Sequence, residues 1–344
     1  MSAALHPRSA TELGEALRSG LGQVRLCGTG SRQDRLPVVS EAVPIHLTGL
    51  DSIHRLDAPD LTCSVDAGVQ RQVLDAALQR VGLELPCLGE GTIGGLFASD
   101  ALGAATAGGA SPRTLLLGME AVLADGTAWK SGARVVKSVA GFDVHKLLVG
   151  SQGRLFAATR LHLRLRPRPR AEAWFSRRGL DQAEALALFL ALRALPIPPA
   201  MLLLRADRTG FEVAGRTAGR ASFVAAMLRT HALAAAAPIA RLHLDAPPGG
   251  EIVTGIVLPS RIPTLLAAAP GAGLLVHGGG RFELGLASPA QTDALLDSLP
   301  GIPAHACIMR GTPARRGLGT PIDPGQQRLT RGLKQALDPH GIFV

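Results

Sequence analysis

The stretch LCGTGSRQD, residues 26–34, decides how the first part of this chain is interpreted. It follows Gln23 to Cys27, a short alternating run that predicts a β-strand. The glycines on either side of Thr29 allow successive backbone N–H groups to point inward, and Ser31 adds a hydroxyl donor. A Rossmann loop would need a third glycine where Gln33 stands, and a Walker loop would need GKS or GKT. The stretch therefore indicates either an anion-binding loop or an ordinary strand-to-turn connection.

The residues around this loop predict alternating helices and strands. Ser9 to Glu12 has the spacing of a capping box and begins a helix, and a second helix over 69–81 ends at Gly82. Strands are predicted over 61–65, 115–123, 127–130 and 161–165, with a hairpin turn at Asp125-Gly126. This part of the chain is β-rich, and we expect its strands to be antiparallel.

Several further segments are rich in glycine. The run from Gly89 to Gly109 has almost no large side chains except Ile93, Leu96 and Phe97, which predicts backbone packed closely against a flat surface. Gly91 to Gly95, Gly141 to Asp143 and Gly150 to Gly153 add more small-residue bends. Separated glycine clusters of this kind indicate a large ligand that passes several loops.

The length of 344 residues favours two domains. The best boundary is the Pro- and Arg-rich segment RLRPRPR, residues 164–170, interpreted as a solvated basic linker. We therefore expect domains over 1–169 and 170–344. Beyond the boundary, helices are predicted over 180–195 and 221–237, and strands over 201–204, 252–258 and 281–286. The fold class is α+β.

Three segments together resemble a known family. CGTGS (27–31), LPCLGEGTIGG (85–95) and VVKSVAGFDVHKLLVGSQG (135–153) are similar to the flavin-binding domain of the vanillyl-alcohol-oxidase, or PCMH-type, superfamily. Within it the chain resembles the FAD-binding subunits of bacterial glycolate oxidases. The resemblance covers residues 22–170 and returns at LDPHGIF, residues 337–343. It implies a two-part FAD-binding domain, followed by a small α+β cap domain and a C-terminal return segment. The flavin would lie between the two parts of the FAD-binding domain, with its ring at the interface with the cap domain.

The resemblance also implies which residues hold non-covalent FAD. The pyrophosphate would be bound by Gly28, Thr29, Gly30 and Ser31. The flavin and its diphosphate would be lined by Gly91, Thr92, Ile93, Gly94 and Gly95, with Ser99 near the ring. The ribityl and ring end would be bordered by Lys137, Val139, Ala140, Gly141, Asp143, Ser151 and Gly153. Lys137 could stabilise a reduced flavin electrostatically or could be an ordinary surface lysine.

This sequence departs from the family pattern at several positions. Phe142 replaces a tyrosine, bulky Arg154 and Phe156 stand where small residues are usual, and the sequence given ends at Val344 where the family continues with Asn-Pro-Gly. The first loop has no histidine for covalent flavin attachment, and Cys87 is interpreted as an unreactive buried thiol.

The resemblance implies oxidation of a small 2-hydroxy acid, glycolate or D-lactate, together with a catalytic flavoprotein subunit and an iron–sulfur subunit. The alternative is a flavin-carrying or scaffold subunit that assembles with a separate catalytic flavoprotein. Catalytic residues are not identified from the sequence. His277, before Gly278 to Arg281, could face a flavin or could be a packed strand end.

Composition excludes other classes of function. The formal net charge is +9, but nine Phe, two Trp and no Tyr provide few stacking platforms, so nucleic acid is not the expected partner. The four cysteines form no CxxC pair, so neither a zinc site nor an iron–sulfur cluster is predicted. The N-terminus lacks the apolar core of a signal peptide, and prolines and glycines interrupt the longest uncharged run, 262–280. We expect a cytoplasmic protein without a membrane span.

Overall fold

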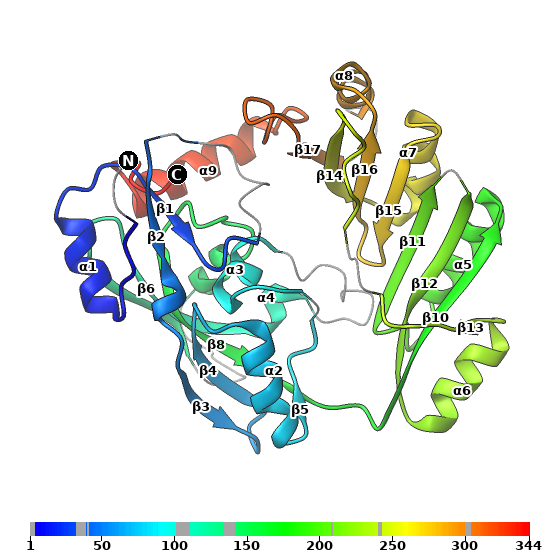
Figure 1. Cartoon of the computed structure of the whole chain (residues 1–344), viewed down its shortest axis with the longest axis horizontal. Coiled ribbons are helices and arrows are strands. Elements are labelled where there is room, and N and C mark those ends of the chain that lie inside the picture. Colours follow the sequence, from blue (N-terminus) through cyan, green and yellow to red (C-terminus); the bar gives the residue numbers. More distant parts are fainter. Residues whose placement is uncertain are drawn as a thin grey trace.

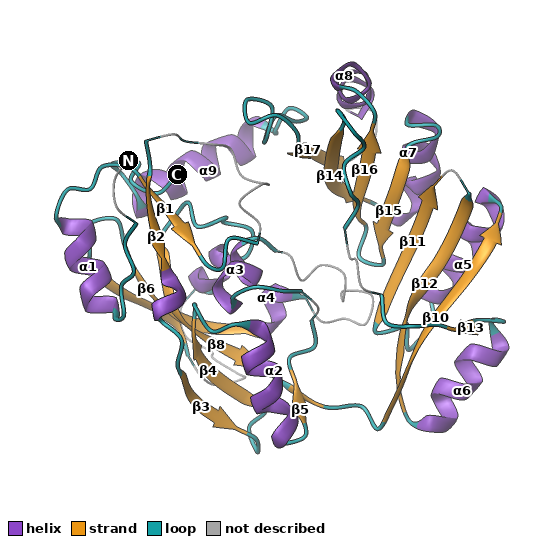
Figure 2. Cartoon of the chain, in the orientation of Figure 1, coloured by secondary structure: helices purple, strands orange, loops and turns teal. Residues whose placement is uncertain are grey.

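The structure is a computed structural model that describes residues 4–31, 39, 41–87, 89–100, 111–133, 142–207, 209–239, 243–299 and 304–344. It combines helices with two large antiparallel sheets (Figures 1 and 2). The prediction of an α+β fold is therefore confirmed.

The first part of the chain is built on a five-stranded antiparallel sheet. Its strands lie in the order β3 (Ile53–Asp57), β4 (Thr62–Asp66), β8 (Ala157–Arg164), β6 (Leu116–Val122) and β7 (Ala128–Gly132). Beside it, β1 (Val24–Cys27) and β2 (Val43–His46) form a parallel pair. The helices of this part are α1 (Ala10–Arg18), α2 (Arg71–Arg80), α3 (Ile93–Ala98) and α4 (Pro112–Leu115), with 3-10 turns over Leu47–Gly49 and Val144–Leu148.

Local sequence explains these elements. The Ser9 hydroxyl accepts the Glu12 N–H at 3.1 Å and caps α1, which buries Leu13 and Leu17. In β4, Cys63 and Val65 face the core while Ser64 and Asp66 face the other way, which is the period of two expected of a strand with one apolar face.

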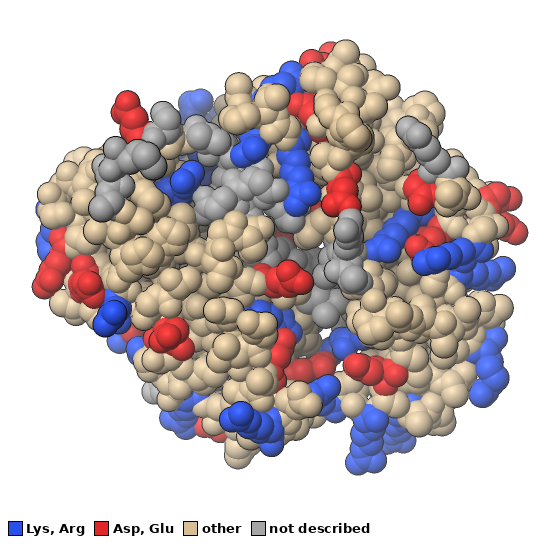
Figure 3. All heavy atoms as spheres, viewed as in Figure 1, with Lys and Arg blue, Asp and Glu red and all other residues tan. Residues whose placement is uncertain are grey.

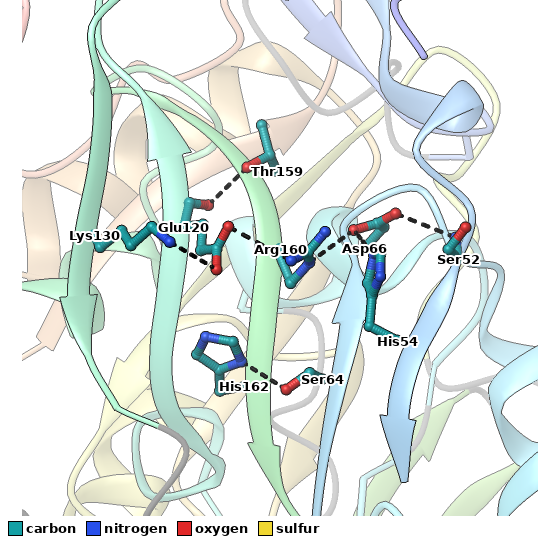
Figure 4. Close-up of polar contacts among 9 residues, drawn as sticks. All are labelled: Ser52, His54, Ser64, Asp66, Glu120, Lys130, Thr159, Arg160 and His162. Atoms are coloured by element: carbon teal, nitrogen blue, oxygen red, sulfur yellow. Dashed lines mark hydrogen bonds and ion pairs between the residues drawn. The ribbon is translucent and has the colours of Figure 1, made fainter. Parts of the chain in front are cut away.

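The outer face of this sheet carries a chain of ion pairs that crosses five strands (Figure 4). Lys130 lies 3.4 Å from Glu120, Glu120 lies 3.6 Å from Arg160, and Arg160 lies 3.2 Å from Asp66. Asp66 also accepts a hydrogen bond from His54 at 2.6 Å. The charges alternate along this chain, so the outer face is stabilised by cross-strand pairing.

The second part of the chain is built on an eight-stranded antiparallel sheet. The strand order is β13 (Ala234–Ala235), β10 (Ala171–Leu180), β12 (Gly210–Gly219), β11 (Met201–Asp207), β15 (Gly273–His277), β16 (Arg281–Leu286), β14 (Glu251–Val257) and β17 (Ala304–Arg310). One face is covered by α5 (Gln182–Arg193), α6 (Ala221–Thr230), α7 (Ile262–Ala268) and α8 (Pro289–Ser298), with a 3-10 turn over Pro259–Arg261 (Figure 1). The helix-free face of the central strands turns toward the first part of the chain.

The segment between the two sheets is more ordered than the sequence predicts. β9 (Arg166–Pro167) pairs with β5 (Leu83–Glu84), and Leu165 is buried with its N–H bonded to the Leu61 carbonyl at 2.7 Å. Arg166 donates from Nε to Glu84 at 2.6 Å. A solvated linker is therefore wrong for residues 165–167, because apolar burial and strand pairing fix them to the first part.

The C-terminal segment returns to the first part of the chain. After α9 (Pro324–Leu337), the buried Phe343 lies beside β1, and the Val24 N–H donates to the Ile342 carbonyl at 2.7 Å. The C-terminal residues consequently lie beside β1 of the first part (Figure 1). On the face seen in Figure 3, basic and acidic side chains are interspersed.

Candidate functional site

A cavity of about 540 Å³ lies between the two parts of the molecule. One wall comes from the loop after β1 and from α3, and the other comes from β14 to β17 of the eight-stranded sheet. This volume is within the ordinary range for pockets that bind small molecules and cofactors.

The first glycine loop forms part of the wall through its backbone. A Cβ atom added to Gly28 would lie 2.4 Å from the Thr92 hydroxyl oxygen, so only glycine fits there without movement. Gly30 has φ of 79°, which glycine adopts without strain. Thr29 and Ser31 complete this loop at the cavity.

Helix α3 is held tightly behind the cavity. The Thr92 hydroxyl caps it by accepting the Gly95 N–H at 3.2 Å. The N–H groups of Ile93 and Gly94 donate to the carbonyls of Val69 and Ala67, each at 2.8 Å. Those two amides are therefore engaged within the protein.

The structure brings most of the described candidate residues to the cavity. The residues that line it are Gly28, Thr29, Gly30, Ser31, Thr92, Gly94, Gly95, Ser99 and Gly153. Gly91, Ile93, Asp143 and Ser151 are described but lie outside the lining, and Lys137, Val139, Ala140 and Gly141 lie outside the described residues.

Four described candidates lie outside the cavity lining because of their surroundings: Gly91, Ile93, Asp143 and Ser151. The Ile93 side chain is fully buried in the core, and the Gly91 carbonyl accepts the Arg71 N–H at 2.8 Å. Asp143 accepts a hydrogen bond from Lys146 at 2.5 Å, which lowers the pKa of its carboxyl. The Ser151 hydroxyl accepts the Gly153 N–H at 3.3 Å and shapes the bend that reaches the cavity.

The residues that depart from the family pattern occupy distinct places. Arg154 and the fully buried Phe156 both line the cavity, whereas Phe142 is 92% exposed. Cys87 is buried outside the lining and accepts a hydrogen bond from Arg71 at 3.0 Å. Burial raises the pKa of Cys87 to about 11 despite the nearby guanidinium, so this thiol stays protonated.

The opposite wall is polar because of strand alternation. Along β15 and β16, Val276, Phe282 and Leu284 point into the core beneath the helices. The intervening residues His277, Arg281 and Glu283 therefore point to the cavity, which they line. Sequence reasoning left His277 open and missed Glu283, although the period of two over 274–286 is the signal that could have found it.

His277 is the most unusual group in this wall. It is 1% exposed, and neither ring nitrogen has a hydrogen-bond partner among the described residues. Burial lowers the pKa of His277 to about 3, so its imidazole is uncharged at neutral pH.

Glu283 is buried but paired. One carboxylate oxygen bonds to Nδ1 of His243, and the other accepts the Leu244 N–H at 2.7 Å. Burial acts to raise the pKa of Glu283, but these hydrogen bonds and the charge of His243 outweigh it and hold the pKa below the usual value. A carboxylate behind an imidazole fixes the orientation of the ring.

Arg281 connects the two walls. Its Nη2 lies 2.6 Å from the Asp100 carboxylate at the end of α3. His305 and Cys307 of β17 also line the cavity. Across the described ranges, no three His, Cys, Asp or Glu side chains lie close enough together to hold a metal ion.

The comparisons with known proteins identify the first part of the chain. Residues 1–132 match the sequence model of the FAD binding domain family. This part of the chain is an FAD-binding domain. The chain is 31% identical to glycolate oxidase subunit GlcE of Escherichia coli over 147 residues, 41% of this chain and 42% of that protein. It is also 31% identical to D-lactate dehydrogenase of Archaeoglobus fulgidus over 165 residues, 46% of this chain and 37% of that protein. These matches span less than half the length of each relative.

The fold beyond the FAD-binding domain is also known. Alkyldihydroxyacetonephosphate synthase superposes with a TM-score of 0.69 at 15% identity, covering 98% of this chain and 74% of that chain. This similarity confirms the overall fold. Among the described helices, none is long and apolar enough to cross a membrane.

The cavity fits FAD on observations of this structure. At Gly28 and Gly94, added Cβ atoms would lie 2.4 and 2.8 Å from side-chain atoms of neighbouring residues. Both positions therefore require glycine, and the backbone of this wall packs directly against its neighbours. In the opposite wall, both ring nitrogens of the buried His277 have no partner among the described residues, which is unusual for buried polar atoms unless a bound group satisfies them.

Proposed function

We propose that this chain is the FAD-binding subunit of a glycolate oxidase-like dehydrogenase complex that oxidises glycolate or D-lactate and holds FAD without a covalent bond. The observation that carries the proposal is that the glycine loop of the FAD-binding domain and the polar wall of β15 and β16 line the same cavity. The similarity to a glycolate oxidase subunit and to a D-lactate dehydrogenase supports the choice of substrate class.

Residues of the FAD-binding domain would hold the cofactor. Gly28 to Ser31 would receive the pyrophosphate, since this loop lines the cavity and its residues are partly or fully exposed. Gly95, Ser99 and Gly153 would border the remaining cofactor, as would Lys137, Val139, Ala140 and Gly141 of the segment before Phe142. When bound, FAD supplies the two-electron acceptor for the oxidation.

The opposite wall would bind and orient the substrate. Arg281 would pair with the carboxylate of a 2-hydroxy acid, because a guanidinium binds carboxylates with a fixed geometry. His243 would hold the proton that the substrate hydroxyl gives up, and Glu283 behind it would stabilise the imidazolium. Placing both groups at one cavity supplies the positioning that such a reaction requires.

Electrons would then leave through a partner. The cysteines of this chain form no CxxC pair, so we assign onward transfer to a catalytic flavoprotein subunit and an iron–sulfur subunit of the complex.

A second candidate function is a flavin-carrying or scaffold subunit without its own catalysis. The observation that favours it is the bulk of Arg154 and Phe156 in the cavity wall. Large side chains at that place would narrow the space for a cofactor ring.

An absorbance spectrum followed by substrate addition tests the proposal. The purified protein should be yellow, and anaerobic glycolate or D-lactate alone should bleach its flavin bands. Bleaching only when partner subunits are added would favour the scaffold. Protein that takes up no FAD when it is supplied in excess would contradict both functions.

A further inference from the structure

His277 has a polar side chain that the protein itself leaves unsatisfied. Both ring nitrogens are inaccessible to solvent and lack partners among the described residues, although the ring lines the cavity. A buried donor or acceptor without a partner is destabilising, and most buried polar groups in proteins are paired. A residue kept for packing alone would be better served by an apolar side chain.

The backbone holds His277 rigidly at this place. It pairs with Leu203 of β11, and the Gly280 N–H donates to its carbonyl at 2.8 Å in the turn to β16. Gly280 itself has φ of 89°, and a Cβ there would lie 2.3 Å from the Val257 carbonyl oxygen. The backbone position of His277 is therefore fixed by strand pairing on one side and by this turn on the other.

The neighbouring groups do not compensate for the missing bonds. Glu283 has both carboxylate oxygens committed to His243 and Leu244, and Nη2 of Arg281 is bound to Asp100. Arg205 is the other charged side chain that acts electrostatically on His277, and it faces Glu212 at 3.9 Å. The described residues therefore leave both nitrogens of His277 unsatisfied on a ring that lines the cavity.

The chemistry of the ring selects the matching ligand atom. An uncharged imidazole has one donor and one acceptor nitrogen. A hydroxyl group is also both donor and acceptor, whereas a carboxylate only accepts. Resting on the proposed function, we infer that His277 hydrogen-bonds the hydroxyl group of the 2-hydroxy acid, while Arg281 receives its carboxylate. His277 then determines specificity for a hydroxylated acid over the same acid without the hydroxyl.

A pair of isosteric substitutions tests this inference. His277→Phe keeps a ring of similar size without polar atoms. Thr217→Val is the matched control, because the buried Thr217 hydroxyl also has no partner within the described part of the chain but lies outside the cavity lining. Both variants should melt higher than the parent by roughly 2 °C or more, since each removes an unsatisfied group.

Ligand binding then separates the two variants. Anaerobic calorimetric titration of protein whose bound FAD has first been reduced with dithionite, so that glycolate binds without being oxidised, should show that the parent and Thr217→Val prefer glycolate over acetate by about tenfold or more. His277→Phe should lose that preference while its FAD affinity stays within about twofold of the parent.

Three outcomes would overturn the inference: a lower melting temperature for His277→Phe, an undiminished glycolate preference, or a loss of FAD affinity that would assign His277 to the cofactor. Failure of the parent to bind FAD would instead overturn the proposed function. The glycolate and acetate titrations of the protein as purified would then decide the role of His277.

Discussion

Gly28 and Thr92 are packed so closely that a single added methyl group would place a carbon 2.4 Å from the Thr92 hydroxyl oxygen. Gly28 follows β1, and Thr92 caps α3, so this contact joins the first two glycine segments that the sequence singles out. The wall that we assign to FAD depends on this close approach.

Gly28→Ala should therefore lower the free energy of unfolding by about 1–3 kcal/mol and weaken FAD binding, because the added carbon must displace Thr92. Urea denaturation and FAD titration measure the two effects. Gly332→Ala in α9 is the control. No atom of the described residues lies within 4 Å of its added Cβ, so this variant should be about 0.4–1 kcal/mol more stable than the parent. Equal behaviour of the two variants would show that the Gly28 contact is not tight.

The buried His277 should make the free energy of unfolding depend on pH. Its folded pKa of about 3 lies below its ordinary value of 6.5, so between these pH values the unfolded chain binds a proton that the folded chain does not. The stability due to the uncharged ring is fully present above pH 6.5 and is lost as pH falls toward 3, at up to about 1.4 kcal/mol per pH unit.

Denaturation curves between pH 7 and pH 5 measure this loss. His277→Phe should show a shallower decline than the parent, because one titrating group has been removed. Parallel declines in the two proteins would mean that His277 titrates alike in the folded and unfolded states.

The outer face of the five-stranded sheet contributes to stability and not to the cavity. Asp66 accepts hydrogen bonds from His54, Arg160 and the Ser52 N–H, with its side chain 11% exposed (Figure 4). Asp66→Ala should cost about 1–3 kcal/mol of unfolding free energy, since it leaves these donors without an acceptor.

Lys130→Ala is the matched comparison on the same face, because the Lys130 side chain is 73% exposed. It should change stability by no more than about 1 kcal/mol. Neither variant should change the amount of FAD bound per folded protein. If Lys130→Ala lowered the free energy of unfolding as much as Asp66→Ala, the expectation that the buried carboxylate contributes more than the exposed lysine would be wrong.

The link between Arg281 and Asp100 should couple the two parts of the molecule. Asp100→Asn removes the charge but keeps a residue type that tolerates the φ of 50° found there. We expect a stability loss of about 0.2–1 kcal/mol, because both side chains are more than a quarter exposed. A double-mutant cycle with Arg281→Ala measures the coupling, and additive effects would show that the pair contributes nothing.

Much of the fold follows from local sequence. The Asp125-Gly126 turn is confirmed by β6 and β7 on either side, with φ of 76° at Gly126, and the strand predicted over 281–286 has the observed bounds of β16. The predicted helix over 221–237 is too long, since α6 ends at Thr230 and Ala232 has φ of 49°. The alanine-rich sequence after Thr230 favours a longer helix, but β13 pairs with β10 and this pairing holds the segment in an extended conformation.

The site could be predicted only in part. Glycine-rich loops reveal the wall of the FAD-binding domain, because close approach of backbone demands small residues in any fold. The opposite wall depends on contacts between distant residues. His243 and Glu283 are 40 positions apart, and only the pairing of the strands and the segment before β14 brings them together. The alternation of apolar and polar residues over β15 and β16 shows which side chains share a face of the sheet. It does not show which part of the chain lies opposite that face.

A crystal structure of the protein grown with FAD tests the central claim most directly. We predict cofactor density in the cavity that contacts the Gly28 to Ser31 loop and ends within reach of His277 and Arg281. Density for FAD at any other place, or a cavity that stays without cofactor when the crystals contain stoichiometric FAD, would contradict it.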